Sequence, residues 1–319
     1  MVDSAKLTSS LRGIIVPMVS PLAAADRLDT AGLERLVDRL IHGGVHGIFL
    51  LGSCGEGPSL DPSLQRELVE RVCQQVGGRI PVLVGVTDAS AQATAALARH
   101  SAEVGADAIV VAPPFYFPLE QAELEAYVNQ LADASPLPVI LYNMPGLTKV
   151  AFEPETVRRL MDNSRVIGLK DSSGDLSYFR EARELTRGRT DWTLLVGPEH
   201  LLTDAMALGG DGGVSGGANV LPQLYVQLYE AARTGFDDEV AAFESDVARL
   251  GHIYSVASPS GITAASVVKG LKGALATLNV CSALPAPPLA PLSAVQTEQV
   301  KQILHSLRAA GEVVTASQQ

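Results

Sequence analysis

Short apolar runs alternate with amphipathic stretches along most of the chain. The runs are nearly continuous and rich in β-branched residues, and the stretches between them repeat apolar positions every three or four residues over roughly 10–17 residues. Eight runs are found, and they begin at residues 13, 47, 80, 108, 137, 166, 192 and 210. A continuous apolar run is buried on both faces, so the pattern predicts parallel strands covered by helices.

Eight strand–helix units are the number that closes a (β/α)8 TIM barrel. The same alternation also fits an open, doubly wound sheet, which often binds a dinucleotide at a glycine-rich turn after its first strand. No such turn follows the first run, and the glycine-rich stretch 209–217 has Ser215 where the fingerprint needs its third glycine. The sequence therefore favours an α/β protein with a (β/α)8 barrel over the open sheet.

The last third of the chain is predicted to be helical. The first of its helices completes the eighth unit, and a proline-rich connection, "LPAPPLAPLS", covers residues 284–293. The predicted helices are 222–234, 237–256, 259–278 and 295–310. We predict two domains, a (β/α)8 barrel over residues 1–234 and an appendage of additional C-terminal helices, packed on the barrel, over residues 235–319.

Composition and charge narrow the function classes. The chain carries 35 acidic and 24 basic residues, which gives a formal net charge of −11. Binding of nucleic acid or of an anionic membrane needs a basic surface, so neither is expected as a partner. No apolar run approaches the ~18 residues of a membrane span, and the N-terminus lacks the apolar segment of a signal peptide. Cys54, Cys73 and Cys281 are too widely spaced for a disulfide framework, and we expect a cytoplasmic protein.

Catalytic groups of a TIM barrel lie where strands end and the following loops begin. The most informative candidate is Lys170, which directly follows the apolar run 166–169. An amine kept short of water is nucleophilic at neutral pH and suits Schiff-base chemistry with a carbonyl substrate. The alternative is a lysine that emerges at the strand end and pairs with Asp171 or with a helix C-terminus. Other polar residues at predicted strand ends are Ser53, Cys54, Glu56, Tyr142, Asn143 and Glu199.

Two further features fit a pocket around Lys170. Tyr142 ends the preceding strand, where a phenol is able to transfer protons, although a tyrosine at the edge of the core with its hydroxyl in water is equally common. The turn "GSCGE", residues 52–56, offers backbone N–H groups and the Ser53 hydroxyl to a carboxylate or phosphate, although such a turn also serves plain strand-to-helix geometry. Because these features lie on three strands of one predicted barrel, we expect them to converge on one pocket.

The motifs "GSCGE", "YNMP" and "GLKDSSGD", in that order, resemble those of the pyruvate-dependent class I aldolases. This family includes dihydrodipicolinate synthase, N-acetylneuraminate lyase and the 2-keto-3-deoxy-sugar-acid aldolases. "IVPMVSP", "GGVSGGANVLP" and "VVKGLKGAL" extend the resemblance over almost the whole chain. The resemblance implies a TIM barrel with C-terminal helices, assembled as a homotetramer. It also implies a lyase that forms or cleaves a carbon–carbon bond between pyruvate and an aldehyde.

The resemblance carries the family's functional residues over to matching positions of this chain. It implies that Lys170 forms an imine with a 2-oxo acid such as pyruvate, and that Tyr142 is the general acid and base. It also implies that Ser53 and Cys54 hold the substrate carboxylate and that Val214 packs against the pyruvyl group. No metal or other cofactor is expected, which agrees with six histidines that lack metal-binding spacing.

Three departures from dihydrodipicolinate synthase bear on the substrate. Leu147 stands where the synthase has an arginine for its second substrate, and an apolar side chain cannot make a bidentate contact with a carboxylate. Phe115 stands where the synthase has a tyrosine of its proton relay, and Tyr116 beside it points to the other side if the chain is extended there. Cys54 replaces a threonine of the same relay, and its thiol is a weak hydrogen-bond donor.

These departures favour a different branch of the family. Leu147 is similar to the residue found in the lyase and sugar-acid branches, and Glu199 stands where the sialic-acid branch binds substrate hydroxyls. We therefore expect a hydroxylated 2-oxo acid, either a 2-keto-3-deoxy sugar acid or a sialic-acid-like compound. The alternatives are a dihydrodipicolinate synthase with an atypical site, a dehydratase that uses the same imine, and a sensor that binds a 2-oxo acid without turnover.

Overall fold

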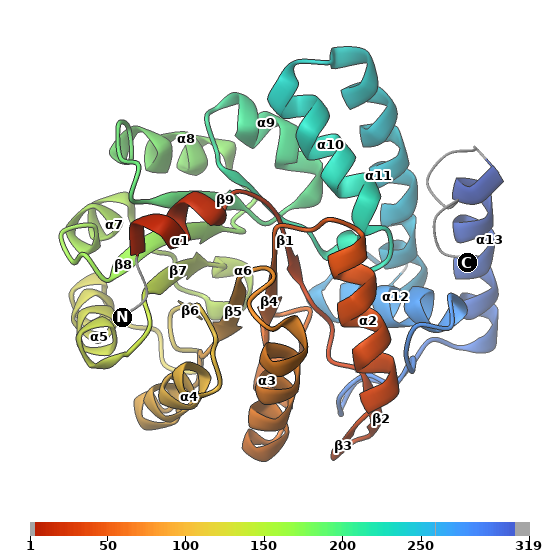
Figure 1. Ribbon diagram of the computed structural model, residues 1–319, viewed down its shortest axis with the longest axis horizontal. Coiled ribbons are helices and arrows are strands. Elements are labelled where there is room, and N and C mark those ends of the chain that lie inside the picture. The colour runs from red at the N-terminus through yellow and green to blue at the C-terminus, as the bar shows by residue number, and fades with distance from the viewer. Residues whose placement is uncertain (1–3, 259, 310–319) are drawn as a thin grey trace. The chain divides into compact units, whose positions relative to one another are not determined.

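In the computed structural model, which describes residues 4–258 and 260–309, eight parallel strands form a closed barrel (Figure 1). Around the barrel the strands follow the order β1-β10-β9-β8-β7-β6-β5-β4, so barrel strands that follow each other in the chain pair with each other. The predicted (β/α)8 barrel is confirmed, and the open-sheet alternative is wrong. The strands are β1 (Gly13–Pro17), β4 (Gly47–Leu50), β5 (Val82–Gly85), β6 (Ala108–Val111), β7 (Val139–Asn143), β8 (Val166–Asp171), β9 (Thr193–Val196) and β10 (Gly212–Val214).

Helices separate the strands, and local side chains fix where several of them begin. The Ser90 hydroxyl accepts a hydrogen bond from Ala93 N at 3.3 Å at the start of α4, and Asp175 accepts one from Ser177 N at 2.8 Å at the start of α8. Such caps satisfy backbone N–H groups of the first helical turn. The helices are α1 (Ser4–Ser10), α2 (Thr30–His42), α3 (Pro62–Val76), α4 (Ala91–Glu103), α5 (Gln121–Ala134), α6 (Pro145–Thr148), α7 (Pro154–Leu160), α8 (Leu176–Leu185), α9 (Leu202–Ala207) and α10 (Pro222–Thr234), with the 3-10 helices η1 (Gly57–Ser59), η2 (Glu199–Leu201) and η3 (Gly216–Asn219).

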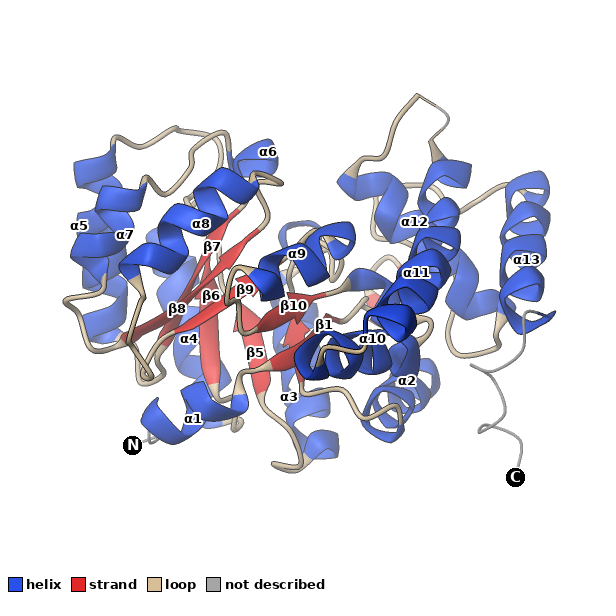
Figure 2. Ribbon diagram, turned by 90° about the horizontal axis from the view of Figure 1, so that it is seen from above, coloured by secondary structure: helices blue, strands red, loops and turns tan. Residues whose placement is uncertain are grey.

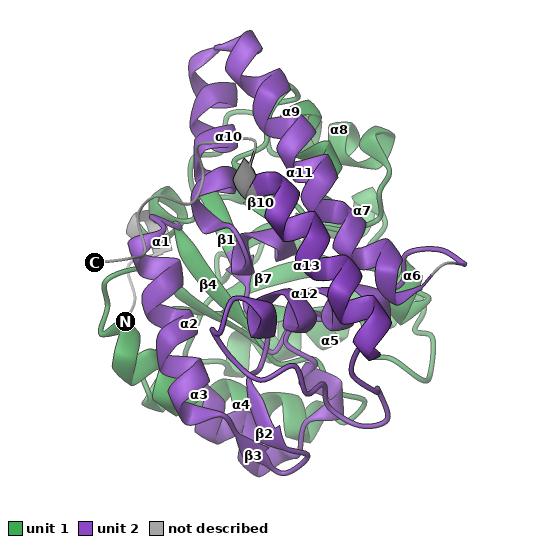
Figure 3. Ribbon diagram, turned by 90° about the vertical axis from the view of Figure 1, so that its right-hand side faces the viewer, with its two compact units in different colours: residues 1–15, 46–50, 69–214 green, residues 16–45, 51–68, 215–319 purple. Residues whose placement is uncertain are grey.

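The chain divides into two compact units, which Figure 3 shows in green and purple. Unit 1 consists of Met1–Ile15, His46–Leu50 and Val69–Val214. Unit 2 consists of Val16–Val45, Leu51–Leu68 and Ser215–Gln319. Unit 1 therefore holds β4 to β10 and the first residues of β1, with α5, α7 and α8 on the outer side of the strands (Figure 2).

An apolar cluster forms the core of unit 1. Leu11, which follows α1, belongs to this cluster, and its carbonyl oxygen accepts a hydrogen bond from Thr193 Oγ1 at 2.8 Å. The interior of the barrel is therefore packed with side chains, as in other TIM barrels. The cluster consists of Leu7, Leu11, Ile15, Phe49, Leu83, Ala108, Val110, Ala112, Ile140, Tyr142, Ile167, Leu195 and Val214.

Unit 2 is mainly helical. In it α11 (Asp237–Ala257) packs against α10, α12 (Ala264–Thr277) and α13 (Ala294–Ala309), and the short strands β2 (Leu22–Ala24) and β3 (Arg27–Leu28) form an antiparallel pair. The predicted boundary after residue 234 falls between α10 and α11, and the division into barrel and appendage stays a prediction. Across the residues that the structure describes, no helix has the length and apolar character needed to cross a membrane.

The predicted helix over 259–278 begins too early. In the structure α12 begins at Ala264, because Thr263 caps it: its Oγ1 accepts from Ser266 N at 3.1 Å, and its N–H donates to Ser266 Oγ at 2.8 Å. Gly261, before the cap, has a φ of 133°, which no α-helix contains. Residue 259 and residue 310, the last of another predicted helix, lie outside the described residues.

Candidate active site

Lys170 and Tyr142 are the second-to-last residues of two neighbouring strands of unit 1, β8 and β7. β7 and β8 pair in parallel, and the register places Tyr142 opposite Lys170 and Asn143 opposite Asp171. Neighbouring residues of a strand point to opposite faces, so the lysine and the tyrosine share one face while the other pair lies on the second. The structure thus places the two residues side by side at the carboxyl ends of their strands, as the sequence predicts.

The amine of Lys170 lies against two aromatic rings. Its Nζ is 3.9 Å from the ring centroid of Tyr142 and 4.9 Å from that of Phe49. The two rings meet edge to face, with centroids 6.2 Å apart and planes at 88°. Lys170 is only 6% exposed and Tyr142 only 8% exposed. The amine is therefore shielded from solvent by the apolar core, which is the environment expected for a nucleophilic lysine.

The Asp171 side chain lies on the opposite face of β8 from this amine. Its carboxylate accepts three hydrogen bonds from neighbouring groups. Its Oδ1 accepts from Asn143 Nδ2 at 2.8 Å and from Ser173 N at 3.0 Å, and its Oδ2 accepts from Ser173 Oγ at 3.0 Å. Burial raises the pKa of Asp171, and the hydrogen bonds from Ser173 and Asn143 oppose that rise. Asn143 Oδ1 also accepts from Phe152 N at 3.1 Å. This network ties the ends of β7 and β8 together and argues against a strand-end ion pair between Lys170 and Asp171.

Val214, Glu199 and Leu147 also lie in unit 1, near the ends of other strands or in the loops after them. Val214 ends β10, is 4% exposed and belongs to the same apolar cluster as Tyr142 and Phe49. Glu199 is the first residue of η2 after β9 and is half-buried. Leu147 lies in α6, after β7, and is 45% exposed. The structure therefore brings Val214 into the surroundings of Tyr142, while Leu147 and Glu199 remain accessible to solvent.

The loop after β6 differs from the extended chain considered above. Tyr116 has a φ of 90°, a left-handed conformation that is strained for an aromatic residue. Its ring is 83% exposed and meets the ring of Phe117, itself 73% exposed, edge to face at 4.9 Å. Phe115 is half-buried. The positive φ changes the direction of the loop at Tyr116, so the expectation that Phe115 and Tyr116 alternate along an extended chain is wrong. The expected homotetramer stays a prediction.

Ser53 and Cys54 belong to unit 2, in the turn that follows β4. Both are half-buried, and the turn contains two left-handed residues, Leu51 at φ 56° and Glu56 at φ 55°. A side chain at Gly57 would place its Cβ 2.1 Å from the Leu51 carbonyl oxygen, so the turn requires glycine there. The turn thus has a specific, non-repetitive backbone, and its role in binding a carboxylate stays a prediction.

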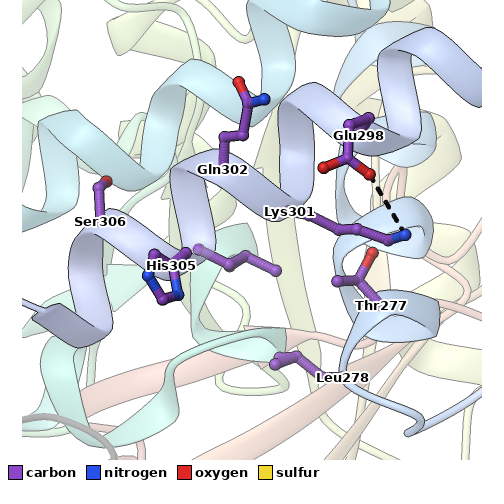
Figure 4. Close-up of a pocket in the computed structure, with 8 residues that line it drawn as sticks. Thr277, Leu278, Glu298, Lys301, Gln302, His305 and Ser306 are labelled. Carbon is purple, nitrogen blue, oxygen red and sulfur yellow. Dashed lines mark ion pairs between the residues drawn. The ribbon is translucent and has the colours of Figure 1, made fainter.

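Unit 2 also contains a surface pocket beside α13, which Figure 4 shows in close-up. Lys301 Nζ lies 3.4 Å from Glu298 Oε2 at its rim, and His305 and Thr277 line it as well. None of the predicted site residues lines this pocket. Among the residues that the structure describes, no group of three or more His, Cys, Asp or Glu side chains is placed to hold a metal ion. The expected absence of a cofactor stays a prediction.

The fold and the strand-end residues define a class, a (β/α)8-barrel protein with a buried lysine and a tyrosine on neighbouring strands. The chain matches the model of the dihydrodipicolinate synthetase family over residues 10–307. It therefore belongs to the dihydrodipicolinate synthetase family, as the motifs indicate.

Known relatives agree with this assignment. The putative 2-dehydro-3-deoxy-D-gluconate aldolase YagE of Escherichia coli K12 is 36% identical over 248 residues, which cover 77% of this chain and 82% of YagE. A dihydrodipicolinate synthase structure from Bacteroides thetaiotaomicron matches with a TM-score of 0.89 at 41% identity, covering 93% of this chain and 98% of that one. The structure of YagE in complex with pyruvate matches with a TM-score of 0.87 at 32% identity, covering 93% and 99%. The chain is accordingly a lyase of this family.

Proposed function

We propose that the protein is a Schiff-base aldolase that joins pyruvate to an aldehyde or cleaves the product. The observation that carries the proposal is the position of Lys170, a buried strand-end amine held 3.9 Å from the centre of the Tyr142 ring. A barrel directs the carboxyl ends of its strands to one rim, where an amine and a phenol on neighbouring strands meet the same substrate. The YagE structure was solved with pyruvate, which supports a 2-oxo acid as the substrate.

The chemistry needs one nucleophile and one group that moves protons. The neutral Lys170 amine attacks the ketone carbon, and loss of water leaves an imine that becomes protonated. The protonated imine withdraws electrons, so a proton leaves the methyl group and an enamine forms. The enamine carbon attacks the aldehyde, and the Tyr142 hydroxyl protonates the resulting alkoxide. Water then adds to the product imine, and breaking of the C–N bond releases the 2-oxo acid and restores the Lys170 amine; cleavage runs through the same steps in reverse. Ser53 and Cys54 hold the carboxylate of the 2-oxo acid in this proposal.

The preferred substrate is a 2-oxo acid with a hydroxylated chain. Leu147, in α6, offers no charge to a second carboxylate, and Lys149 beside it donates from Nζ to the Gly146 carbonyl oxygen at 2.9 Å. Glu199, half-buried after β9, is a carboxylate able to accept hydrogen bonds from substrate hydroxyls. The name of the relative YagE, a putative 2-dehydro-3-deoxy-D-gluconate aldolase, supports the same substrate class.

Borohydride reduction in the presence of pyruvate tests the proposal. An imine is reduced to a stable secondary amine, so the peptide that contains Lys170 gains the mass of a reduced pyruvyl adduct. Release of pyruvate from a 2-dehydro-3-deoxy sugar acid then measures turnover. Trapping at Lys170 together with release supports the aldolase, whereas an unlabelled Lys170 would rule out the imine. Trapping without turnover on any aldehyde or 2-oxo acid would instead identify a sensor.

Dihydrodipicolinate synthase is the second candidate. It is favoured by the match at 41% identity to the protein of that name from Bacteroides thetaiotaomicron. The two candidates differ in the second substrate, since the synthase condenses pyruvate with aspartate semialdehyde. Comparing kcat/KM for that condensation with kcat/KM for cleavage of 2-dehydro-3-deoxy sugar acids separates them, and we expect the second value to be larger.

Pyruvate is expected to slow the alkylation of Cys54 by iodoacetamide, because a carboxylate bound at the turn covers the thiol. Burial raises the pKa of Cys73 to about 12 and that of Cys281 to about 12, so both react slowly and serve as internal controls. Peptide mass spectrometry after a timed reaction measures all three cysteines at once. A Cys54 rate that does not depend on pyruvate concentration would contradict the role of the turn.

A further inference from the structure

A buried ion pair in unit 2 lies directly behind the turn that contains Ser53 and Cys54. Glu56, two residues after Cys54, pairs through Oε1 with Nζ of Lys272 in α12. The Lys272 side chain is 0% exposed and that of Glu56 is 3% exposed. Two opposite charges removed from water in this way are costly unless every remaining polar atom finds a partner.

Both charged groups do find such partners. Oε2 of Glu56 accepts a hydrogen bond from Ala286 N at 2.6 Å, and Nζ of Lys272 donates one to the Leu284 carbonyl oxygen at 2.8 Å. Burial lowers the pKa of Lys272, and the Glu56 carboxylate opposes that change. The pair therefore joins three segments, which are the turn after β4, the helix α12 and the connection 284–286. Each segment is held by directional contacts rather than by apolar packing alone.

The pair acts on the turn through its backbone. Glu56 has a left-handed φ of 55°, and its N–H donates to the Ser53 carbonyl oxygen at 3.2 Å. On the other side of the turn, Ser20 Oγ donates to the Gly55 carbonyl oxygen at 2.6 Å. A left-handed conformation at a residue other than glycine persists only where its surroundings impose it. At Glu56 the anchored side chain supplies that constraint, so loss of the anchor releases the backbone at Ser53.

We propose that Glu56 and Lys272 are positioning residues that hold the Ser53–Cys54 turn in the shape that binds the carboxylate of the 2-oxo acid. The helix α12 thereby supports substrate binding from outside the turn. This inference rests on the proposed function, in which the turn binds that carboxylate. Neither Glu56 nor Lys272 takes part in a chemical step. Substitutions at these residues should therefore change the half-saturating pyruvate concentration more than the maximal rate.

The variants Glu56→Gln and Lys272→Met test the pair. Each is treated with borohydride over a range of pyruvate concentrations, and the rate of adduct formation at Lys170 is measured. We expect the half-saturating pyruvate concentration to rise about tenfold or more, because a displaced binding group loses the oriented contacts. The maximal trapping rate should stay within about threefold of wild type, since no group that reacts has changed. Protection of Cys54 by pyruvate should shift to higher concentration in parallel.

The exposed pair Glu230 and Arg233 in α10 provides a matched control. Their side chains are 2.6 Å apart and are 43% and 56% exposed, and both residues lie on one helix of the same unit. Glu230→Gln and Arg233→Met likewise remove one negative and one positive charge from a pair, here an exposed one on α10. Neither is expected to change the half-saturating concentration, because exposed pairs contribute little to structure.

Single variants leave one buried charge without its partner and risk unfolding, so two further measurements are included. The double variant Glu56→Gln/Lys272→Met has no unpaired charge, and the glutamine that replaces Glu56 keeps an acceptor for Ala286 N. This double variant should still show the raised half-saturating pyruvate concentration. In the wild type, pyruvate should slow hydrogen exchange at the Ala286 amide, because coupling between two sites is reciprocal. Its neighbours Pro285 and Pro287 have no N–H, which isolates this signal.

The outcomes separate the two proposals. Absence of trapping in the wild type would overturn the proposed function and this inference together. Normal trapping in the wild type with unchanged half-saturation in a folded single or double variant would overturn this inference alone. If no variant folds, exchange at Ala286 decides: slower exchange with pyruvate supports the inference, and unchanged exchange overturns it.

Discussion

Replacing Lys170 with alanine is expected to abolish both the borohydride-trapped adduct with pyruvate and aldolase turnover, with a loss of turnover of at least about 10⁴-fold. The reason is that alanine has no nucleophile, so the imine on which every later step depends cannot form. The measurement is the mass of the peptide containing residue 170 after reduction, together with pyruvate release from a 2-dehydro-3-deoxy sugar acid. Adduct formation at another lysine in the variant would show that the imine was assigned to the wrong residue.

The fold is expected to survive this change. Lys170 contacts the rings of Tyr142 and Phe49, and a cation–π contact of this kind contributes about 0.5–2 kcal/mol. Removing a buried amine also removes the cost of its burial, which offsets part of that loss. We therefore expect the free energy of unfolding in urea to change by less than about 2 kcal/mol.

Lys170→Arg is the matched control for charge. A guanidinium keeps the positive charge at this position but stays protonated, so it cannot attack a ketone. The arginine variant should therefore lose trapping as completely as the alanine variant. An arginine variant with normal turnover would indicate that the charge alone matters and that catalysis does not pass through an imine.

The barrel and the central pair of residues were predictable from the sequence for a physical reason. Strands buried on both faces leave continuous apolar runs, and parallel strands in a barrel pair in chain order. Consequently Tyr142 and Lys170, each at the end of such a run, had to become neighbours, and the register of β7 and β8 confirms this. The side of the strand on which Asp171 lies follows from the same alternation.

Other features depend on contacts that no local pattern records. Glu56 accepts from Ala286 N across 230 residues of chain, and a lysine in an apolar helix gives no sign of which carboxylate it meets. The start of α12 depends on a capping box at Thr263, which lies inside the helix predicted over residues 259–278. At Tyr116 the backbone adopts a positive φ that is rare for an aromatic residue, so propensity favours the wrong conformation. The sequence pointed to Glu56 as a polar strand-end residue and to the lysines of "VVKGLKGAL", but nothing in it paired Glu56 with Lys272.

Replacing Tyr142 with phenylalanine is expected to lower kcat by about 10²–10⁴-fold, the usual effect of a positioned acid or base. Phenylalanine keeps the ring that lies 3.9 Å from Lys170 Nζ and that meets the Phe49 ring edge to face, so the hydroxyl is the only group removed. The adduct with pyruvate should still form, more slowly, because the amine remains in place. Steady-state turnover and the time course of trapping together separate proton transfer from imine formation.

Tyr127→Phe supplies the control for loss of a half-buried tyrosine hydroxyl elsewhere in unit 1. Tyr127 lies in α5, and its hydroxyl donates a hydrogen bond to Thr94 Oγ1 at 3.3 Å. Removal of this hydroxyl should leave kcat unchanged. A Tyr142→Phe variant that turns over within a few-fold of wild type would mean that another group moves the proton. Because the phenylalanine ring preserves the contacts around the amine, such a result could not be attributed to a displaced Lys170. It would place the acid and base outside the pair formed by β7 and β8.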